Sequence, residues 1–211
     1  MVEKQLARPW KTWACFHTPM FSFDTDGACC GIVPRTVGGP YSVLVAEQLA
    51  ASGAKVIVGL TSAGRIRADL KIPSLVLATG AIRDEGTSYH YLPPGRIVAA
   101  PQPVLVYLRR ELARLPIPLT EGILWTTDAP YRETYGQLER HSSEGAVAVE
   151  MQAASLFAFS KRQGTPVAIV AHVSNAVDYD GEPFDRGTAV DELSILQAVC
   201  QGASKFLLEA Q

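Results

Sequence analysis

Residues 145–178 constrain the fold of this chain more than any other stretch. Their pattern predicts a short strand, then a helix over residues 150–162 that Gly164 closes, and finally an apolar strand over residues 167–174. Polar side chains stand at both junctions, which is the usual layout of an α/β active site. The junction residues are Glu150, Met151 and Gln152 before the helix, and Ser174, Asn175 and Asp178 after the strand.

The same alternation of strands and helices runs along the rest of the chain. Further helices are expected at residues 40–49, 101–115 and 189–209, and further strands at 27–36, 55–60, 75–79 and 123–127. Residues 1–26, which are rich in aromatics, are expected to form a strand or a docked loop. This order predicts an α/β layered fold with a mostly parallel sheet and helices on both faces. With 211 residues, no internal repeat and no linker, a single domain over 1–211 is expected.

Composition narrows the classes of function. The net charge is −2 and no basic cluster exceeds a short pair, so nucleic-acid binding has no electrostatic support. No apolar run approaches the roughly 20 residues of a membrane span, and the N-terminus lacks the apolar stretch of a signal peptide. We therefore expect no membrane partner and a cytoplasmic location. The four cysteines lack metal-site spacing, so we expect no metal and no disulfide framework, only buried thiols in a reducing compartment.

Two small-residue segments are candidates for binding an anion or a sugar. Gly38 and Gly39 precede Pro40 at the expected start of a helix, where free backbone N–H groups can hold an anion or a sugar hydroxyl. An ordinary tight turn is the alternative. Thr61 and Ser62 lie in a predicted turn at residues 61–64, directly after a strand, where their hydroxyls could contact a ligand.

Two denser segments are candidates for binding a flat ring. Residues 79–91 contain Thr87, Tyr89 and His90, and aromatic side chains on both sides would suit a heterocycle. His90 bonded to a backbone carbonyl is the alternative. Asp128 and Arg132 follow another strand, and Arg132 either reaches a ligand or forms a surface ion pair.

His172, inside the apolar run of residues 167–173, is interpreted as a hydrogen-bonded core group rather than a catalyst. The usual motifs of serine hydrolases, zinc proteases, NTPases and dinucleotide-binding enzymes do not occur in the sequence.

Six motifs occur in a characteristic order along the chain: VGGP (37–40), GAKVIVGLTSAG (53–64), LVLATGAIRDEGTSYHYLPP (75–94), WTTDAPYRET (125–134), VEMQAA (149–154) and VAHVSNAVD (170–178). Their order and spacing resemble the nucleoside phosphorylase and nucleosidase family, above all its uridine-phosphorylase-like and methylthioadenosine-nucleosidase-like branches. The resemblance extends from about residue 27 to the C-terminus.

This resemblance implies a three-layer α/β/α fold with a mixed, mostly parallel sheet, and cleavage of the N-glycosidic bond of a small-molecule nucleoside by phosphate or water. It implies phosphate as a possible co-substrate, no resident cofactor, and a homo-oligomer whose subunits share active sites. The implied roles are ribose binding by Glu150, Met151 and Gln152; phosphate or water binding by Thr61, Ser62, Gly38 and Gly39; catalysis by Ser62 and Asn175; and base binding by Thr87, Tyr89, His90, Asp128 and Arg132.

Three positions depart from the family pattern. Gln152 replaces the second acid of an E-M-E triplet, Asn175 replaces the aspartate that protonates a leaving purine, and Gly59 stands where phosphorylases carry an arginine. An arginine–phosphate bond contributes roughly 1.5–3 kcal/mol, and general acid catalysis contributes about 10²–10⁴-fold. Asn175 therefore favours a pyrimidine over an acid-assisted purine substrate. Arg35, Arg65 or a neighbouring subunit are alternative sources of a phosphate-binding cation.

Three functional hypotheses follow from these departures. A phosphorylase is preferred; a water-using nucleosidase and a catalytically degenerate nucleoside-binding protein are the alternatives. The family's first strand and its G-D-P-x-x-R loop are also missing from the sequence, so a further hypothesis is that the chain is a truncated product of a longer protein.

Overall fold

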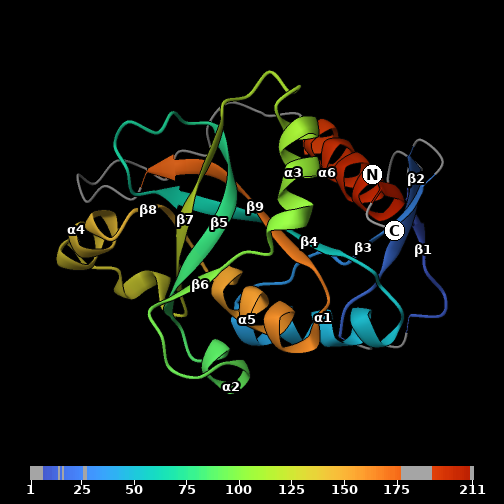
Figure 1. Cartoon of the computed structure of the whole chain (residues 1–211), viewed down its shortest axis with the longest axis horizontal. Coiled ribbons are helices and arrows are strands. Elements are labelled where there is room, and N and C mark those ends of the chain that lie inside the picture. The colour runs from blue at the N-terminus through green and yellow to red at the C-terminus, as the bar shows by residue number, and fades with distance from the viewer. Residues whose placement is uncertain (1–6, 14, 16, 26–27, 177–191, 210–211) are drawn as a thin grey trace.

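A six-stranded mixed sheet with the order β6-β5-β7-β8-β4-β9 forms the centre of the computed structural model (Figure 1). The structure describes residues 7–13, 15, 17–25, 28–176 and 192–209. The strands are β4 (Ile57–Arg65), β5 (Ser74–Asp84), β6 (Ile97–Ala99), β7 (Leu119–Thr127), β8 (Ala146–Glu150) and β9 (Val167–Ala176).

The central sheet curls into a barrel-like ring because β5 also pairs with β9. The pairings β4–β9, β5–β7 and β7–β8 are parallel, whereas β4–β8, β5–β6 and β5–β9 are antiparallel. The two longest pairings, β4–β9 and β5–β7, are both parallel. The predicted mixed sheet is therefore confirmed. Residues 167–171 of β9 are fully buried, which explains why this strand has a continuous apolar run instead of an alternating pattern.

Helices cover the sheet on both sides, as predicted. Helices α3 and α6 pack together on one side, and α5 packs with α1 and α2 on the other (Figure 1). A Cβ added to Gly202 of α6 would lie 3.0 Å from the Cα of Leu108 in α3, so these two helices approach closely because this position is a glycine. The helices are α1 (Gly39–Ala51), α2 (Ser88–Tyr91), α3 (Gln102–Leu112), α5 (Ala153–Gln163) and α6 (Glu192–Glu209).

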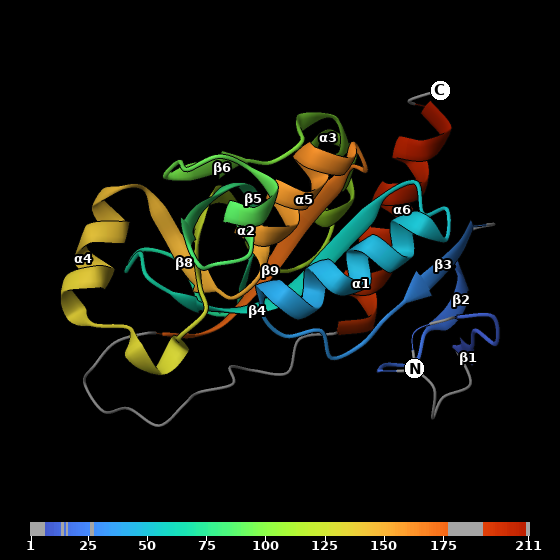
Figure 2. The ribbon, with the colours of Figure 1, turned by 90° about the horizontal axis from the view of Figure 1, so that it is seen from below.

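The N-terminal region adds a separate three-stranded antiparallel sheet, made of β1 (Arg8–Pro9), β2 (Phe21–Thr25) and β3 (Ala28–Ile32). Phe23 of this sheet packs in a small apolar cluster with Cys200 and Leu196 of α6. Strand structure before residue 27 is thus confirmed. Figure 2 shows this sheet at the opposite end of the molecule from α4 (Tyr135–Ser143).

Several predicted boundaries were wrong. Residues 61–64, predicted as a turn, remain inside β4, because that stretch continues its pairing with β9 and meets β8 at Gly64 and Arg65. Strand β5 runs on to Asp84, well past the predicted end at residue 79. Glu150 ends β8, and α5 starts only at Ala153. Asp178 and residues 189–191 of the predicted last helix lie outside the described residues.

Helix α4 and the short 3-10 helix η1 (Pro130–Arg132) were not predicted. A capping box marks the start of α4: the Thr134 hydroxyl accepts the Gln137 N–H at 3.3 Å, and the Gln137 side chain accepts the Thr134 N–H at 3.0 Å. The sequence therefore carried a helix-start signal, although only Leu138 and His141 of this helix are buried.

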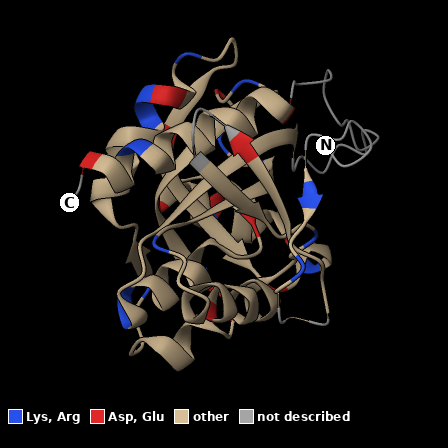
Figure 3. Ribbon diagram, turned by 90° about the vertical axis from the view of Figure 1, so that its right-hand side faces the viewer, with Lys and Arg blue, Asp and Glu red and all other residues tan. Residues whose placement is uncertain are grey.

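In the part of the chain that the structure describes, no helix is long and apolar enough to cross a membrane. Figure 3 shows acidic and basic residues interspersed along the ribbon, without a large segment of one sign.

Candidate functional site

A cavity of about 1410 Å³ lies between the N-terminal sheet, α1, β4, α6 and the junction of β8 with α5. It exceeds the roughly 300–1,000 Å³ of common small-molecule pockets. Five of the residues predicted from the sequence to contact a ligand line this cavity: Gly38, Thr61, Ser62, Met151 and Gln152. Gly38 precedes α1, Thr61 and Ser62 belong to β4, and Met151 and Gln152 lie between β8 and α5. The sequence predicted each of these groups separately, and the tertiary structure brings them together.

Strand β4 presents both side chains and backbone to this cavity. The N–H of Ile57 donates to the Pro166 carbonyl at 3.0 Å, so every second residue from Ile57 faces β9. The backbone groups of Val58, Leu60 and Ser62 therefore point to the other edge, where no described strand pairs with β4 before Gly64. All three residues line the cavity. The backbone N–H groups at this edge and the Ser62 hydroxyl are thus available to an anion or a sugar, whereas the Thr61 hydroxyl donates to the Ser62 carbonyl at 3.1 Å.

Gly38 begins α1 with a backbone φ of 81°, in the left-handed region that favours glycine. The next residue, Gly39, is buried and lies outside the cavity lining. A Cβ at Gly39 would lie 2.3 Å from the Ser155 Oγ and 3.2 Å from the Thr87 Oγ1. This glycine allows α1 to approach α5 closely.

Of the three ribose candidates, Glu150 does not line the cavity. It is 4% exposed, and its oxygens accept the Gln152 N–H at 2.7 Å and the Ala153 N–H at 3.0 Å. Burial raises the pKa of Glu150 to about 7, against hydrogen bonds from the Thr126 hydroxyl and the α5 backbone that lower it. The carboxylate positions the start of α5, and only Met151 and Gln152 of the triplet reach the cavity.

Asn175 lies in β9 opposite Gly64 of β4, outside the cavity lining. Its side-chain amide donates to the Ala176 carbonyl at 3.5 Å. The catalytic candidates Ser62 and Asn175 are therefore on neighbouring strands, but only Ser62 lines the cavity.

None of the five base-binding candidates lines the cavity. The Asp128 carboxylate accepts the Gly86 N–H at 2.9 Å, which joins the end of β7 to the segment that carries Thr87, Tyr89 and His90. Tyr89 donates its hydroxyl to the Arg83 carbonyl at 3.1 Å, and its ring lies 4.2 Å from the Arg83 guanidinium carbon. His90 and Arg132 are exposed. The structure thus brings the two base-binding segments together without placing their side chains in the cavity.

The sequence pattern of the phosphorylase superfamily matches residues 23–209. The chain belongs to the phosphorylase superfamily. The family resemblance inferred from the six motifs is thereby confirmed.

Three individual relatives share 26% to 30% sequence identity with the chain over the aligned residues. The chain is 26% identical to a guanosine phosphorylase of Halorubrum lacusprofundi over 148 residues, which cover 70% of this chain and 61% of that protein. It is 29% identical to a purine nucleoside phosphorylase DeoD-type of Hahella chejuensis over 176 residues, covering 79% and 72%. It is 30% identical to a uridine phosphorylase of Thermococcus kodakarensis over 105 residues, covering 50% and 38%. The chain thus spans less than two thirds of the length of two of these relatives.

In this member of the phosphorylase superfamily, a buried polar network that was not predicted holds α2 against α5. Arg83 donates to the Ser88 Oγ at 2.8 Å and to the Pro93 carbonyl at 2.7 Å. The Glu85 carboxylate accepts the Ser88 N–H at 3.0 Å and the Ser155 hydroxyl. Arg83 and Glu85 are 4% and 7% exposed. Both residues lie within the segment 79–91 that was predicted to bind a flat ring, and their burial at the end of β5 is not visible in a linear pattern.

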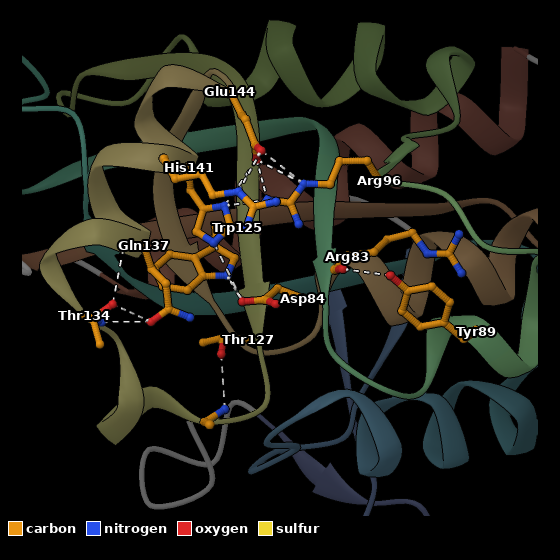
Figure 4. A network of polar contacts seen from close by, with 12 residues as sticks. Arg83, Asp84, Tyr89, Arg96, Trp125, Thr127, Thr134, Gln137, His141 and Glu144 are labelled. Carbon is orange, nitrogen blue, oxygen red and sulfur yellow. Dashed lines mark hydrogen bonds and ion pairs between the residues drawn. The ribbon is translucent and has the colours of Figure 1, made fainter.

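A second network in this superfamily member fixes α4 to the sheet (Figure 4). The Trp125 indole N–H donates to the Asp84 carboxylate at 2.9 Å, and the rings of Trp125 and His141 lie 4.2 Å apart. The Arg96 guanidinium beside Glu144 lowers the pKa of that carboxyl to about 2. No residue of this network lines the cavity, so we assign it a structural role.

Two further expectations were wrong in part. Cys29 is exposed and Cys30 is half-buried, whereas all four thiols were expected to be buried. His172 was expected to be a hydrogen-bonded core group, yet its buried Nε2 has no hydrogen-bond partner among the described residues. Burial lowers the pKa of His172, partly offset by the charge of Glu192.

Proposed function

We propose that this chain cleaves the N-glycosidic bond of a nucleoside, with phosphate as the preferred attacking group, to release the free base and a sugar 1-phosphate. The observation that carries the proposal is the convergence of Gly38, Thr61, Ser62, Met151 and Gln152 on one cavity in a member of the phosphorylase superfamily. Relatives named guanosine, purine nucleoside and uridine phosphorylases support the reaction class but not one substrate.

The residues at the cavity suit this chemistry. Glycosidic cleavage passes through a cationic, oxocarbenium-like sugar. Gln152, 5% exposed and beside Met151, can hydrogen-bond the ribose hydroxyls without adding a negative charge. Thr61 and Ser62, with the free backbone N–H groups of β4, would bind phosphate or orient water. Asn175 can donate a hydrogen bond but cannot give up a proton, so a base that leaves without strong acid assistance is preferred.

Hydrolysis is the second candidate, and it is favoured by the position of Gly59. A Cβ at Gly59 would lie 2.6 Å from the Ile169 Cδ1 and 3.6 Å from the Leu156 Cδ1, so this position faces apolar side chains. Among the described residues that line the cavity, the cationic side chains are Arg35 and Lys55, and both are exposed. A solvated cation binds phosphate more weakly than a buried one. Water as the attacking group would need no cationic side chain to bind it.

We further propose that the reaction needs no resident cofactor and that the protein is a homo-oligomer. The base-binding candidates on α2 and η1 lie outside the cavity, so a neighbouring subunit would help to complete the site. Sedimentation of the purified chain tests the oligomer.

The test is a panel of purine and pyrimidine nucleosides, incubated with the full chain with and without inorganic phosphate, and analysed by chromatography for free base. We expect base release that requires phosphate. Phosphate-independent release would instead identify a nucleosidase. Thermal stabilisation by a nucleoside without any base release would identify a binding protein, and the double variant Gln152→Glu, Asn175→Asp would then be expected to gain activity.

Two variants connect the activity to the cavity. Ser62→Ala and Gln152→Ala should each lower kcat/KM by about tenfold to hundredfold, the cost of one hydrogen bond to a charged or developing-charge group. Ser143→Ala on α4 is the matched control, because Ser143 is exposed, lies outside the cavity lining and donates its hydroxyl to the Arg140 carbonyl of its own helix. Equal activities for Ser62→Ala and Ser143→Ala would place the reaction elsewhere.

A further inference from the structure

Two cysteines from distant parts of the chain meet at the wall of the cavity. Cys30 belongs to β3 of the N-terminal sheet, and Cys200 belongs to α6. Cys200 is 7% exposed and forms an apolar cluster with Phe23, against which Cys30 and Leu196 pack. Both cysteines also line the cavity, which gives small molecules a route to them. Both are free thiols.

The side chain of Cys200 lowers the pKa of Cys30, although burial and the charge of Asp24 oppose the effect. The side chain of Cys30 and burial raise the pKa of Cys200. A partly buried thiol with a lowered pKa, packed against a cluster that contains a buried second thiol, is the arrangement of a reactive cysteine with a resolving partner.

Cys29 provides an internal comparison. Neighbouring residues of a strand point to opposite faces, so Cys29 and Cys30 have different surroundings. Cys29 is exposed and pairs across the hairpin with Asp24. Burial and the Asp24 carboxylate raise its pKa. Exposure alone would therefore select Cys29 for modification, whereas contact with a second thiol selects Cys30.

We propose that Cys30 and Cys200 form a thiol–disulfide modification site that reacts with a small disulfide of the glutathione type. The Cys30 thiolate attacks one sulfur of glutathione disulfide and displaces one glutathione thiolate. Cys200 then loses its proton and attacks the Cys30 sulfur, which displaces the second glutathione. Two protein thiols are oxidised, one glutathione disulfide is reduced to two thiols, and the two protons pass to the released glutathiones.

The resulting Cys30–Cys200 bond would join β3 to α6 across residues far apart in sequence. It would fix two walls of the cavity relative to each other. Because long closed loops gain most from a cross-link, we expect the melting temperature to rise by roughly 5 °C or more. The proposal does not depend on nucleoside cleavage, since it concerns only the two thiols.

The experiment treats the full reduced chain with glutathione disulfide near neutral pH, blocks the remaining thiols with iodoacetamide, and maps the peptides without reduction. We expect a peptide pair joined through Cys30 and Cys200 within one chain. Cys29→Ser is the matched control and should form the same bond. Glutathione retained only on Cys29 or Cys15, or disulfides only between chains, would overturn the proposal.

Two substitutions at one position separate the roles of Cys200. Cys200→Ser keeps a hydrogen-bond donor and should stop the reaction at a stable Cys30–glutathione mixed disulfide. Cys200→Ala removes the donor and should slow the modification of Cys30 several-fold relative to Cys200→Ser. Equal rates for these two variants, measured by mass spectrometry, would remove the assigned role of the Cys200 thiol. The peptide map of the unsubstituted chain decides the proposal even if a variant fails to fold.

Discussion

The Thr126 hydroxyl donates a 2.6 Å hydrogen bond to the Glu150 carboxylate, and the same hydroxyl oxygen accepts the Ala154 N–H at 3.0 Å. These bonds join the end of β7 to the end of β8 and to the first turn of α5. Free N–H groups at a helix start need such acceptors. Met151 and Gln152, which line the cavity, lie between the two anchored points, so their position depends on a carboxylate that is itself buried.

This buried carboxylate predicts an unusual pH dependence. The pKa of Glu150 in the folded chain is raised to about 7 from an ordinary value of 4.5. Between these values the folded state holds a proton that the unfolded state has released, so stability falls as pH rises from about 4.5 to about 7. The contribution is roughly 3 kcal/mol.

The Glu150→Gln variant isolates this effect, since its side chain does not titrate. Urea unfolding of both proteins from pH 4.5 to pH 8 should show the advantage of the unsubstituted chain shrinking by roughly 3 kcal/mol as pH rises. A difference that stays constant with pH, or that grows, would contradict the assigned pKa.

Gly39→Ala should destabilise the chain by about 1–3 kcal/mol, because the added methyl group would sit 2.3 Å from the Ser155 Oγ and 3.1 Å from its Cβ. Gly136→Ala in α4 is the matched control: a Cβ there meets nothing within 4 Å, and alanine favours a helix, so stability should stay equal or rise slightly. Thermal melts of the two variants compare them directly. Similar melting temperatures would mean that α1 does not need this close approach.

Glu144 should show the opposite pH response. Its folded pKa is lowered to about 2, so its contribution is present above about pH 4.5 and is lost as pH falls toward 2. The carboxylate is 27% exposed and its partner Arg96 is 37% exposed, so solvent screening limits the contribution to about 1 kcal/mol. Glu144→Gln should therefore cost about that much at pH 7 and almost nothing near pH 2. The exposed Glu139→Gln on the same helix is the control and should change stability little at either pH.

The open edge of β4 predicts an alternating pattern of hydrogen exchange. The amides of Gly59 and Thr61 face β9 and should exchange slowly, whereas those of Val58 and Leu60 face the cavity and should exchange rapidly. Residue-resolved exchange by NMR measures all four. Equal protection of the four amides would show that another strand covers this edge in solution.

Much of the layered fold was accessible from local patterns. The apolar run of β9 predicted a strand, and Gly164 predicted the end of the helix before it. Both elements are present in that order, and Gly164 has a φ of 78°. Residues 61–64 were misassigned because their small, polar side chains are typical of a turn, whereas the pairing partner β9 lies more than a hundred residues later. A local pattern cannot report such a partner.

The candidate site was only partly predictable for the same reason. Thr61, Ser62, Met151 and Gln152 were selected from strand-end chemistry and family resemblance, and they share one cavity. Glu150 was grouped with them by sequence, but its oxygens are used by the α5 backbone. The packing of Cys30 against the cluster that contains Cys200 had no signal at all in the sequence.

The sequence by itself determined the alternation of strands and helices and the membership of the superfamily, because periodicity and short motifs are properties of neighbouring residues. The tertiary structure decided which polar groups line the cavity. It also decided which polar groups already hydrogen-bond the backbone at a helix end or other side chains in a buried network. Burial and hydrogen-bond partners depend on segments that meet only after folding. Glu150 and Gln152, two residues apart in the chain, are almost equally buried, at 4% and 5% exposed. They differ because the Glu150 carboxylate accepts backbone N–H groups at the start of α5, whereas Gln152 lines the cavity.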